Sequence, residues 1–108
     1  MKKIKGRDFV TLDEFIQKDF KDNPSQADLY LDESIKEYKQ DRDQQMLIAS
    51  LHDVVKAKGF CYIARKTGLN RQTIYRALSK NGNPTFNTLN TILEALGYGF
   101  DFIKIKAG

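Results

Sequence analysis

Cysteine and histidine are almost absent from this chain, which has one cysteine, Cys61, and one histidine, His52. A single thiol excludes an intramolecular disulfide and leaves no thiolate cluster for a structural zinc ion, which fits a reducing compartment. Cys61 has no recognisable base partner, and no glycine-rich loop that could bind a phosphate group occurs. The cluster Asp41-Arg42-Asp43 has the wrong spacing for a calcium loop. We therefore predict no enzyme activity, no cofactor and no metal site.

Long apolar runs are also missing. No stretch approaches the roughly 18 apolar residues of a membrane-spanning helix, and the basic start Met1-Lys2-Lys3 is not followed by the apolar region of a secretion signal. These absences predict a cytoplasmic protein without membrane contact. The length of 108 residues suits one compact core, and a hydrophobic fraction of 41% is ordinary for a globular protein.

Acidic residues are absent from one long window, residues 54–93, which nevertheless contains seven lysines and arginines. Residues 1–45 hold 9 Lys and Arg against 11 Asp and Glu, whereas residues 46–108 hold 9 against 3. Such a basic window is typical of a surface that binds a polyanion. A basic surface that is merely solvated would show the same charge pattern.

Apolar residues at three- and four-residue spacing predict four helices outside the central segment. They are expected at residues 12–21, 24–38, 44–58 and 85–96. The first follows a capping box, Thr11-Leu12-Asp13-Glu14, and the second has Asn23 as its cap and ends at the polar run 39–43. Gly59 and Gly97 suit the ends of the last two helices. In the last helix, Phe86 is expected to be buried together with the leucines.

The central segment, residues 60–79, predicts two short helices around a turn at residues 67–69. Ala64 is small where the helices cross, Gly68 suits a positive φ in the turn, and Asn70 caps the second helix. The apolar contacts between the helices are expected from Ile63, Leu69, Ile74, Ala77 and Leu78. This pattern indicates a helix-turn-helix whose second helix lies in the major groove of DNA.

The outward side chains of the second helix can all donate or accept hydrogen bonds, and none is acidic. Arg71 and Arg76 can bond guanine and Gln72 can bond adenine, so we predict base contacts from these residues, with Tyr75 on a thymine methyl or a phosphate. The predicted contacts to the DNA backbone come from Tyr62, Arg65, Lys66, Asn70, Thr73, Ser79, Lys80, Asn81, Asn83 and Thr85. The helix start after Thr85 adds backbone N–H donors. A basic helical hairpin without a ligand is the alternative.

The C-terminal segment, residues 98–105, is aromatic and β-branched and predicts one short strand. No second strand is evident in the sequence. Because an unpaired strand edge can pair with another chain, we expect homodimerisation through this segment. The alternative is a tail that packs flat on its own helices.

Four runs of sequence resemble the addiction-module antidote proteins, which are HigA-like antitoxins in the Xre/Cro group of helix-turn-helix repressors. They are residues 54–59, 64–78, 82–86 and 92–97. The resemblance covers about residues 25–103, and its most specific part runs from Tyr75 to Pro84. The sequence departs from the family pattern at Phe60-Cys61-Tyr62, where family members often carry glycine or polar residues.

The resemblance implies a mainly α, lambda-repressor-like bundle of about five to six helices with a short C-terminal β-strand. It also implies a dimeric antitoxin that binds its own DNA operator and neutralises a RelE/ParE-type toxin. In this reading residues 1–42 form an acidic accessory segment, residues 43–97 the DNA-binding domain, and residues 98–108 the dimerisation strand. The acidic stretch 13–43 would complement a basic toxin. Two other functions stay open: a prophage or chromosomal repressor without a toxin, and a protein-interaction module that has lost DNA binding.

Overall fold

The computed structural model describes residues 3–4, 7–8, 17–18, 20, 22–23 and 25–106. Within them the body consists of five helices, which are α2 (Ser25–Asp41), α3 (Gln44–Lys58), α4 (Phe60–Thr67), α5 (Arg71–Ala77) and α6 (Phe86–Ala95). Strands β1 (Lys3–Ile4) and β2 (Arg7–Asp8), which were not predicted, pair antiparallel with Lys3 opposite Asp8. Most of the helix predicted at residues 12–21 lies outside the described residues. No described helix is long and apolar enough to span a membrane.

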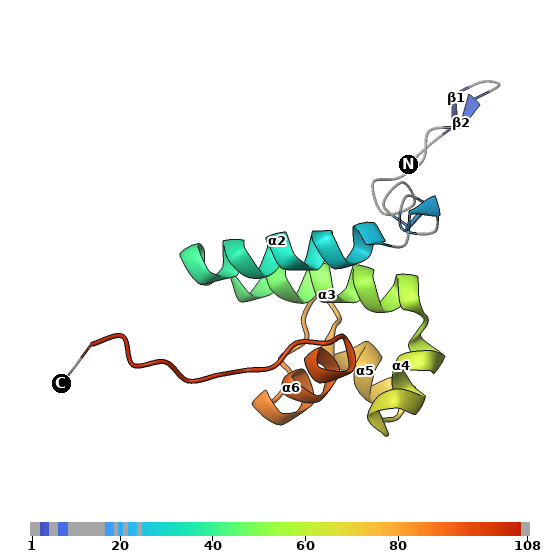
Figure 1. The fold of residues 1–108 in the computed structure, drawn as a ribbon. Helices are drawn as coiled ribbons and strands as arrows, with labels where there is room; N and C mark the ends of the chain where they lie inside the picture. The colour runs from blue at the N-terminus through green and yellow to red at the C-terminus, as the bar shows by residue number, and fades with distance from the viewer. Residues whose placement is uncertain are drawn as a thin grey trace.

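Helix α3 is the centre of the fold. It lies between α2 on one side and the group of α4, α5 and α6 on the other (Figure 1). Its limits match the prediction, and its apolar residues Leu47, Ile48, Leu51, Val54 and Val55 are all buried. The buried Ser50 hydroxyl donates to the Met46 carbonyl at 3.1 Å and accepts from the Ser34 hydroxyl at 2.8 Å. The buried Ser50 hydroxyl between α2 and α3 therefore has its hydrogen-bond partners.

Helix α2 is about one turn longer than predicted. The polar run 39–43 was expected to end it near Tyr38, but the helix continues to Asp41. Lysine and glutamine are good helix formers, so polarity alone does not end a helix there. The helix ends where Arg42 takes a positive φ of 56° and its N–H bonds the Tyr38 carbonyl at 2.7 Å. Asp43 then caps α3 by accepting from the Met46 N–H at 3.2 Å.

The core continues from α3 into the C-terminal half of the body. Helix α4 packs against α3, α5 and α6. Ile63 of α4, Ile74 of α5 and Ile92 of α6 are fully buried. Because α5 has only seven residues, this packing is what holds it as a helix.

The C-terminal strand predicted at residues 98–105 is not seen. Residues 98–105 form no regular structure. Tyr98 packs against the core, and the end of the segment extends away from the helices (Figure 1). A strand requires a neighbour for its backbone hydrogen bonds, and the described part of the chain offers none to this segment.

The predicted burial of Phe86 is wrong as well. Its side chain is 59% exposed, because it is the first residue of α6 and lies at the uncovered end of the apolar face of that helix. Its ring packs against the ring of Phe100 with 4.9 Å between centroids.

Candidate nucleic-acid interface

The turn between α4 and α5 has the conformation that the sequence predicted. Gly68 has a left-handed φ of 79°, and its N–H bonds the Ala64 carbonyl at 2.9 Å. An added Cβ at Gly68 would meet nothing within 4 Å, so glycine is favoured here by φ and not by space. Asn70 caps α5, since its side-chain oxygen accepts from the N–H groups of Gln72 and Thr73 at 2.7 and 3.3 Å.

Helix α5 presents the predicted set of side chains to solvent. Arg71, Gln72, Tyr75 and Arg76 are exposed, and Thr73 is half-buried. The guanidinium of Arg71 donates to the Cys61 sulfur of α4 at 3.0 Å. This hydrogen bond raises the pKa of Arg71. No pattern in the sequence predicted this contact.

Three aromatic rings connect α3, α4 and α5. The ring of Phe60 lies 4.4 Å from that of Tyr75 and 5.6 Å from that of His52, between centroids. Tyr75 is therefore packed on one side, although 40% of it remains exposed. Phe60 has a structural role here, because its ring supports the exposed helix.

A hollow of about 440 Å³ lies between α5 and the loop that leads into α6. Six of the predicted DNA-contacting residues line it, which are Thr73, Arg76, Ser79, Asn81, Asn83 and Thr85. Thr85 also caps α6 by accepting from the Thr88 N–H at 3.1 Å. The structure thus brings base-contact and backbone-contact candidates onto one concave surface.

Gly82 allows the loop to approach α5 closely. A Cβ at this position would lie 2.5 Å from the Arg76 carbonyl oxygen and 2.6 Å from that of Ala77. The Gly82 N–H bonds the Ser79 carbonyl at 2.9 Å. This close approach was not predicted from the sequence.

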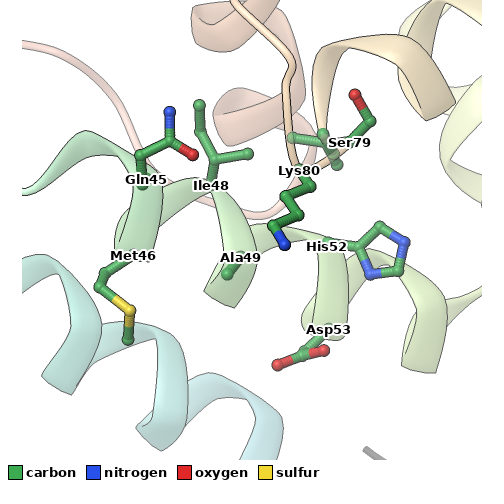
Figure 2. Close-up of a pocket in the computed structure, with 9 residues that line it drawn as sticks. Gln45, Met46, Ile48, Ala49, His52, Asp53, Ser79 and Lys80 are labelled. Atoms are coloured by element: carbon green, nitrogen blue, oxygen red, sulfur yellow. The ribbon is translucent and has the colours of Figure 1, made fainter.

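Other predicted residues lie away from this hollow. Tyr62 and Lys66 line a separate hollow that also contains Asp28 and Glu94, and the Lys66 ammonium lies 5.6 Å from the centre of the Tyr62 ring. Lys80 reaches from the loop after α5 toward α3, where it lines a third hollow with residues such as Gln45 and Met46 (Figure 2). Arg65 is exposed on α4.

The basic side chains of α4 and α5 form no ion pair with an acidic side chain of the described residues. Among the ion pairs of the described residues, none uses Arg65, Lys66, Arg71 or Arg76. Their charges are therefore available to an anion. No group of three His, Cys, Asp or Glu side chains within the described ranges could hold a metal ion.

The fold and this surface define a small helical protein with a basic face. Residues 11–104 match the family described as "Probable addiction module antidote protein". The chain belongs to this family, and an antidote implies a toxin as partner. It is 36% identical over 72 residues to an uncharacterized protein of Haemophilus influenzae, covering 67% of this chain and 70% of that protein. No solved structure matches the chain.

Proposed function

We propose that this protein is a HigA-like antitoxin of the Xre/Cro group. It represses its own module by binding operator DNA, and it neutralises a RelE/ParE-type toxin. In this proposal residues 43–97 form a lambda-repressor-like helix-turn-helix domain, in which α4 and α5 are the two helices of the motif. The protein acts in the cytoplasm as a homodimer and is not an enzyme.

The observation that carries the DNA-binding proposal is the hollow beside α5. It joins Arg76 of the exposed helix to the Asn and Thr side chains of the loop, in a window without acidic residues. Side chains that can bond base edges therefore adjoin side chains that can bond phosphates, which is the combination that specific DNA binding needs. Arg71, Gln72 and Tyr75 extend the base-reading surface along α5. The first N–H groups of α6, after Thr85, add donors for a phosphate.

The remaining predicted contacts are assigned to the DNA backbone. Asn70 uses its side-chain oxygen in the cap of α5, so only its NH₂ group would reach a phosphate. Arg65 and Lys80 would contact phosphates on either side of α5, and Tyr62 and Lys66 would do so at the edge of the interface. Two copies would place their α5 helices in successive major grooves, roughly 34 Å apart.

Operator binding should be strongly salt-dependent. With about six phosphate contacts, counterion release should weaken binding about a thousandfold when the salt concentration rises fourfold. A gel-shift assay with the DNA upstream of the protein's own reading frame measures this. Binding that does not change with salt would contradict phosphate contacts and favour a protein-interaction module without DNA binding.

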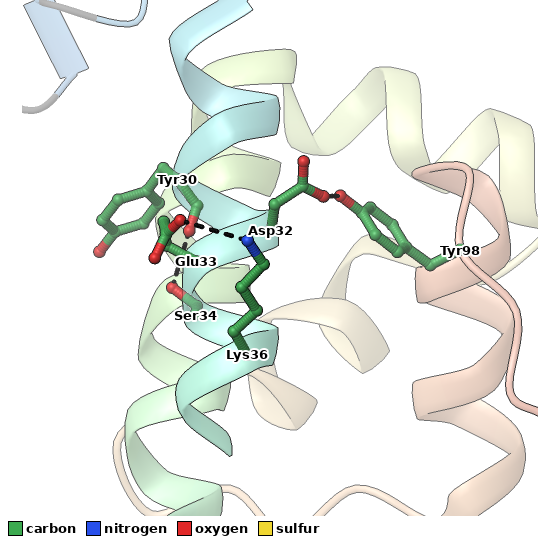
Figure 3. A network of polar contacts seen from close by, with 6 residues as sticks. All are labelled: Tyr30, Asp32, Glu33, Ser34, Lys36 and Tyr98. Carbon is green, nitrogen blue, oxygen red and sulfur yellow. Dashed lines mark hydrogen bonds and ion pairs between the residues drawn. The ribbon is translucent and has the colours of Figure 1, made fainter. Parts of the chain in front are cut away.

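The toxin-binding surface in this proposal is the exposed side of α2. Its acidic residues are Asp28, Asp32, Glu33, Glu37 and Asp41, and all are exposed. Glu33 pairs with Lys36 of the same helix at 3.7 Å, Asp28 pairs with Lys58 of α3 at 3.6 Å, and Asp32 accepts from the Tyr98 hydroxyl (Figure 3). A basic toxin would find a complementary charge here, on the opposite side of α3 from α5 (Figure 1).

Reversing two charges on α2 should separate the two functions. The double variant Glu33→Lys and Glu37→Lys should bind the toxin about tenfold more weakly and lose growth rescue on co-expression with the product of the adjacent gene. Its operator affinity should be unchanged. Glu94→Lys, a charge reversal on α6, is the matched control and should still rescue. If the double variant rescues fully, α2 is not the toxin-binding surface.

Family membership supports an antitoxin over a repressor without a toxin. The co-expression assay tests that choice directly. If the adjacent gene product is harmless and nothing needs rescue, the repressor without a toxin is the better description, and the DNA-binding proposal still stands.

A further inference from the structure

Two of the predicted base-contacting side chains of α5 touch the first turn of α4. Arg71 contacts Cys61, and Tyr75 contacts Phe60. By contrast, the side chain of Arg76 forms no hydrogen bond, ion pair or ring contact within the described part of the chain. The exposed face of α5 therefore combines side chains that α4 holds with one that it does not hold.

The contact of Arg71 with Cys61 orients the guanidinium and leaves most of its donors unused. One guanidinium N–H donates to the Cys61 sulfur at 3.0 Å, across the turn that joins the two helices. A thiol sulfur is a weak acceptor, and the other N–H groups of the guanidinium stay available to a ligand. Bidentate recognition of guanine needs two donors in a fixed plane. A guanidinium held at one N–H samples fewer orientations of that plane than a mobile one does.

The ring of Tyr75 is held by the neighbouring residue of the same turn. Its centroid lies 4.4 Å from that of Phe60, and the Phe60 ring has the His52 ring of α3 as a further neighbour at 5.6 Å. Phe60 is half-buried, while 40% of Tyr75 remains exposed. The contact covers one side of the Tyr75 ring and restricts its rotation. A ligand of α5 therefore meets the same part of this ring each time.

We propose that Cys61 and Phe60 are positioning residues, which set the base preference of α5 through Arg71 and Tyr75. This inference deepens the proposed function and rests on it, because a base preference exists only if α5 reads DNA. Side chains that read base edges must be held within narrow limits of direction, whereas contacts to phosphates carry no sequence information. Loss of the two contacts should therefore lower operator preference and leave binding to unrelated DNA nearly unchanged.

The exposure of Cys61 separates this role from simple stabilisation of the helix pair. Its side chain is exposed, whereas the buried contacts of α4 and α5 come from residues such as Ile63 and Ile74. Cys61→Ala removes a hydrogen-bond acceptor and no core packing, so the urea midpoint of unfolding should not change. Phe60→Leu keeps an apolar side chain of similar size and removes the ring. Both variants should therefore fold.

Nuclear magnetic resonance tests the Arg71 contact on the full chain without DNA. The ¹⁵N relaxation of the arginine Nε groups should show a more restricted side chain at Arg71 than at Arg76. Cys61→Ala should make the two alike, and Cys61→Ser should restore part of the restriction, because its hydroxyl is also an acceptor. An Arg71 side chain as mobile as Arg76 in the natural chain would overturn the positioning role of Cys61.

Operator preference, the ratio of affinities for operator and scrambled DNA, tests the effect on reading. Cys61→Ala should lower this ratio about fivefold, because residues in contact act together. In an Arg71→Ala chain the same change should have no effect, since the side chain that Cys61 positions is missing. In an Arg76→Ala chain, the matched control, it should again lower the ratio about fivefold.

Phe60→Leu should depend on Tyr75 in the same way. It should lower the ratio in the natural chain, have no effect in a Tyr75→Ala chain and keep its full effect in a Gln72→Ala chain. Losses that persist without Arg71 and Tyr75, or that are equal on scrambled DNA, would overturn the proposal while operator binding stands. A natural chain without operator preference would overturn the proposed function, and this inference with it, so the two failures can be told apart.

Discussion

Replacing Arg71 and Arg76 together with alanine should weaken operator binding at least about thirtyfold, since each base contact contributes about 1–3 kcal/mol. Arg76 lines the hollow beside the loop, and Arg71 is held at the start of α5 by its contact with Cys61. Both side chains are exposed, so their removal should leave the fold intact. Fluorescence anisotropy with a labelled operator fragment measures the change.

Two control variants separate base reading from simple charge. Lys36→Ala with Lys39→Ala removes the same two charges from α2 and should change the affinity little. Arg71→Lys with Arg76→Lys keeps the charge but loses the bidentate geometry, so it should retain binding to scrambled DNA and lose preference for the operator. If the α2 variant weakens binding as much as the α5 variant does, α5 is not the reading helix.

Gly82→Ala should destabilise the protein by about 1–3 kcal/mol, the usual cost of forcing an extra methyl group into a filled space. The new Cβ would lie 2.5 and 2.6 Å from two backbone oxygens of the α5 segment, which cannot move as a flexible side chain would. The loop must therefore shift away from α5 and change the hollow. Chemical unfolding measures the first effect, and operator affinity the second.

Gly99→Ala is the matched control for this change. Apart from Gly99 itself and its two chain neighbours, no residue has a heavy atom within 4 Å of a Cβ built at Gly99. Its free energy of unfolding should stay within about 0.5 kcal/mol of the natural chain. A Gly82→Ala variant as stable as Gly99→Ala would mean that the loop does not need its close approach to α5.

The helices of the body could be predicted because their signals are local. Helix α3 has an apolar stripe along its whole length and a cap at each end, and both of its limits are as predicted. In α6, Thr85 caps the first turn as expected. The end of α2 was missed because the positive φ of Arg42 has no signature in an arginine.

The errors at Phe86 and in the tail have a common cause. Periodicity identifies apolar side chains, but it does not say whether anything covers them. Phe86 continues the apolar stripe of α6, but the segments that cover this stripe end before they reach Phe86. The segment after Tyr98 has strand composition, and a strand forms only where a second one is present.

At the candidate interface the sequence predicted the turn and the exposed set on α5. Gly68 and Asn70 could be recognised because turns and caps select residue types. The contacts of Arg71 with Cys61 and of Tyr75 with Phe60 join residues from different helices, and no single-chain pattern encodes them. The assigned contacts to bases and phosphates stay predictions.

The row of rings from His52 through Phe60 to Tyr75 has a consequence for the entropy of binding. A seven-residue helix in water would sample many conformations, and ordering it on contact would cost affinity. The rings and the buried Ile74 remove that freedom before any ligand arrives. A ligand that contacts α5 meets a helix that is already formed. Less conformational entropy is then lost on binding, so more of the interaction energy contributes to affinity.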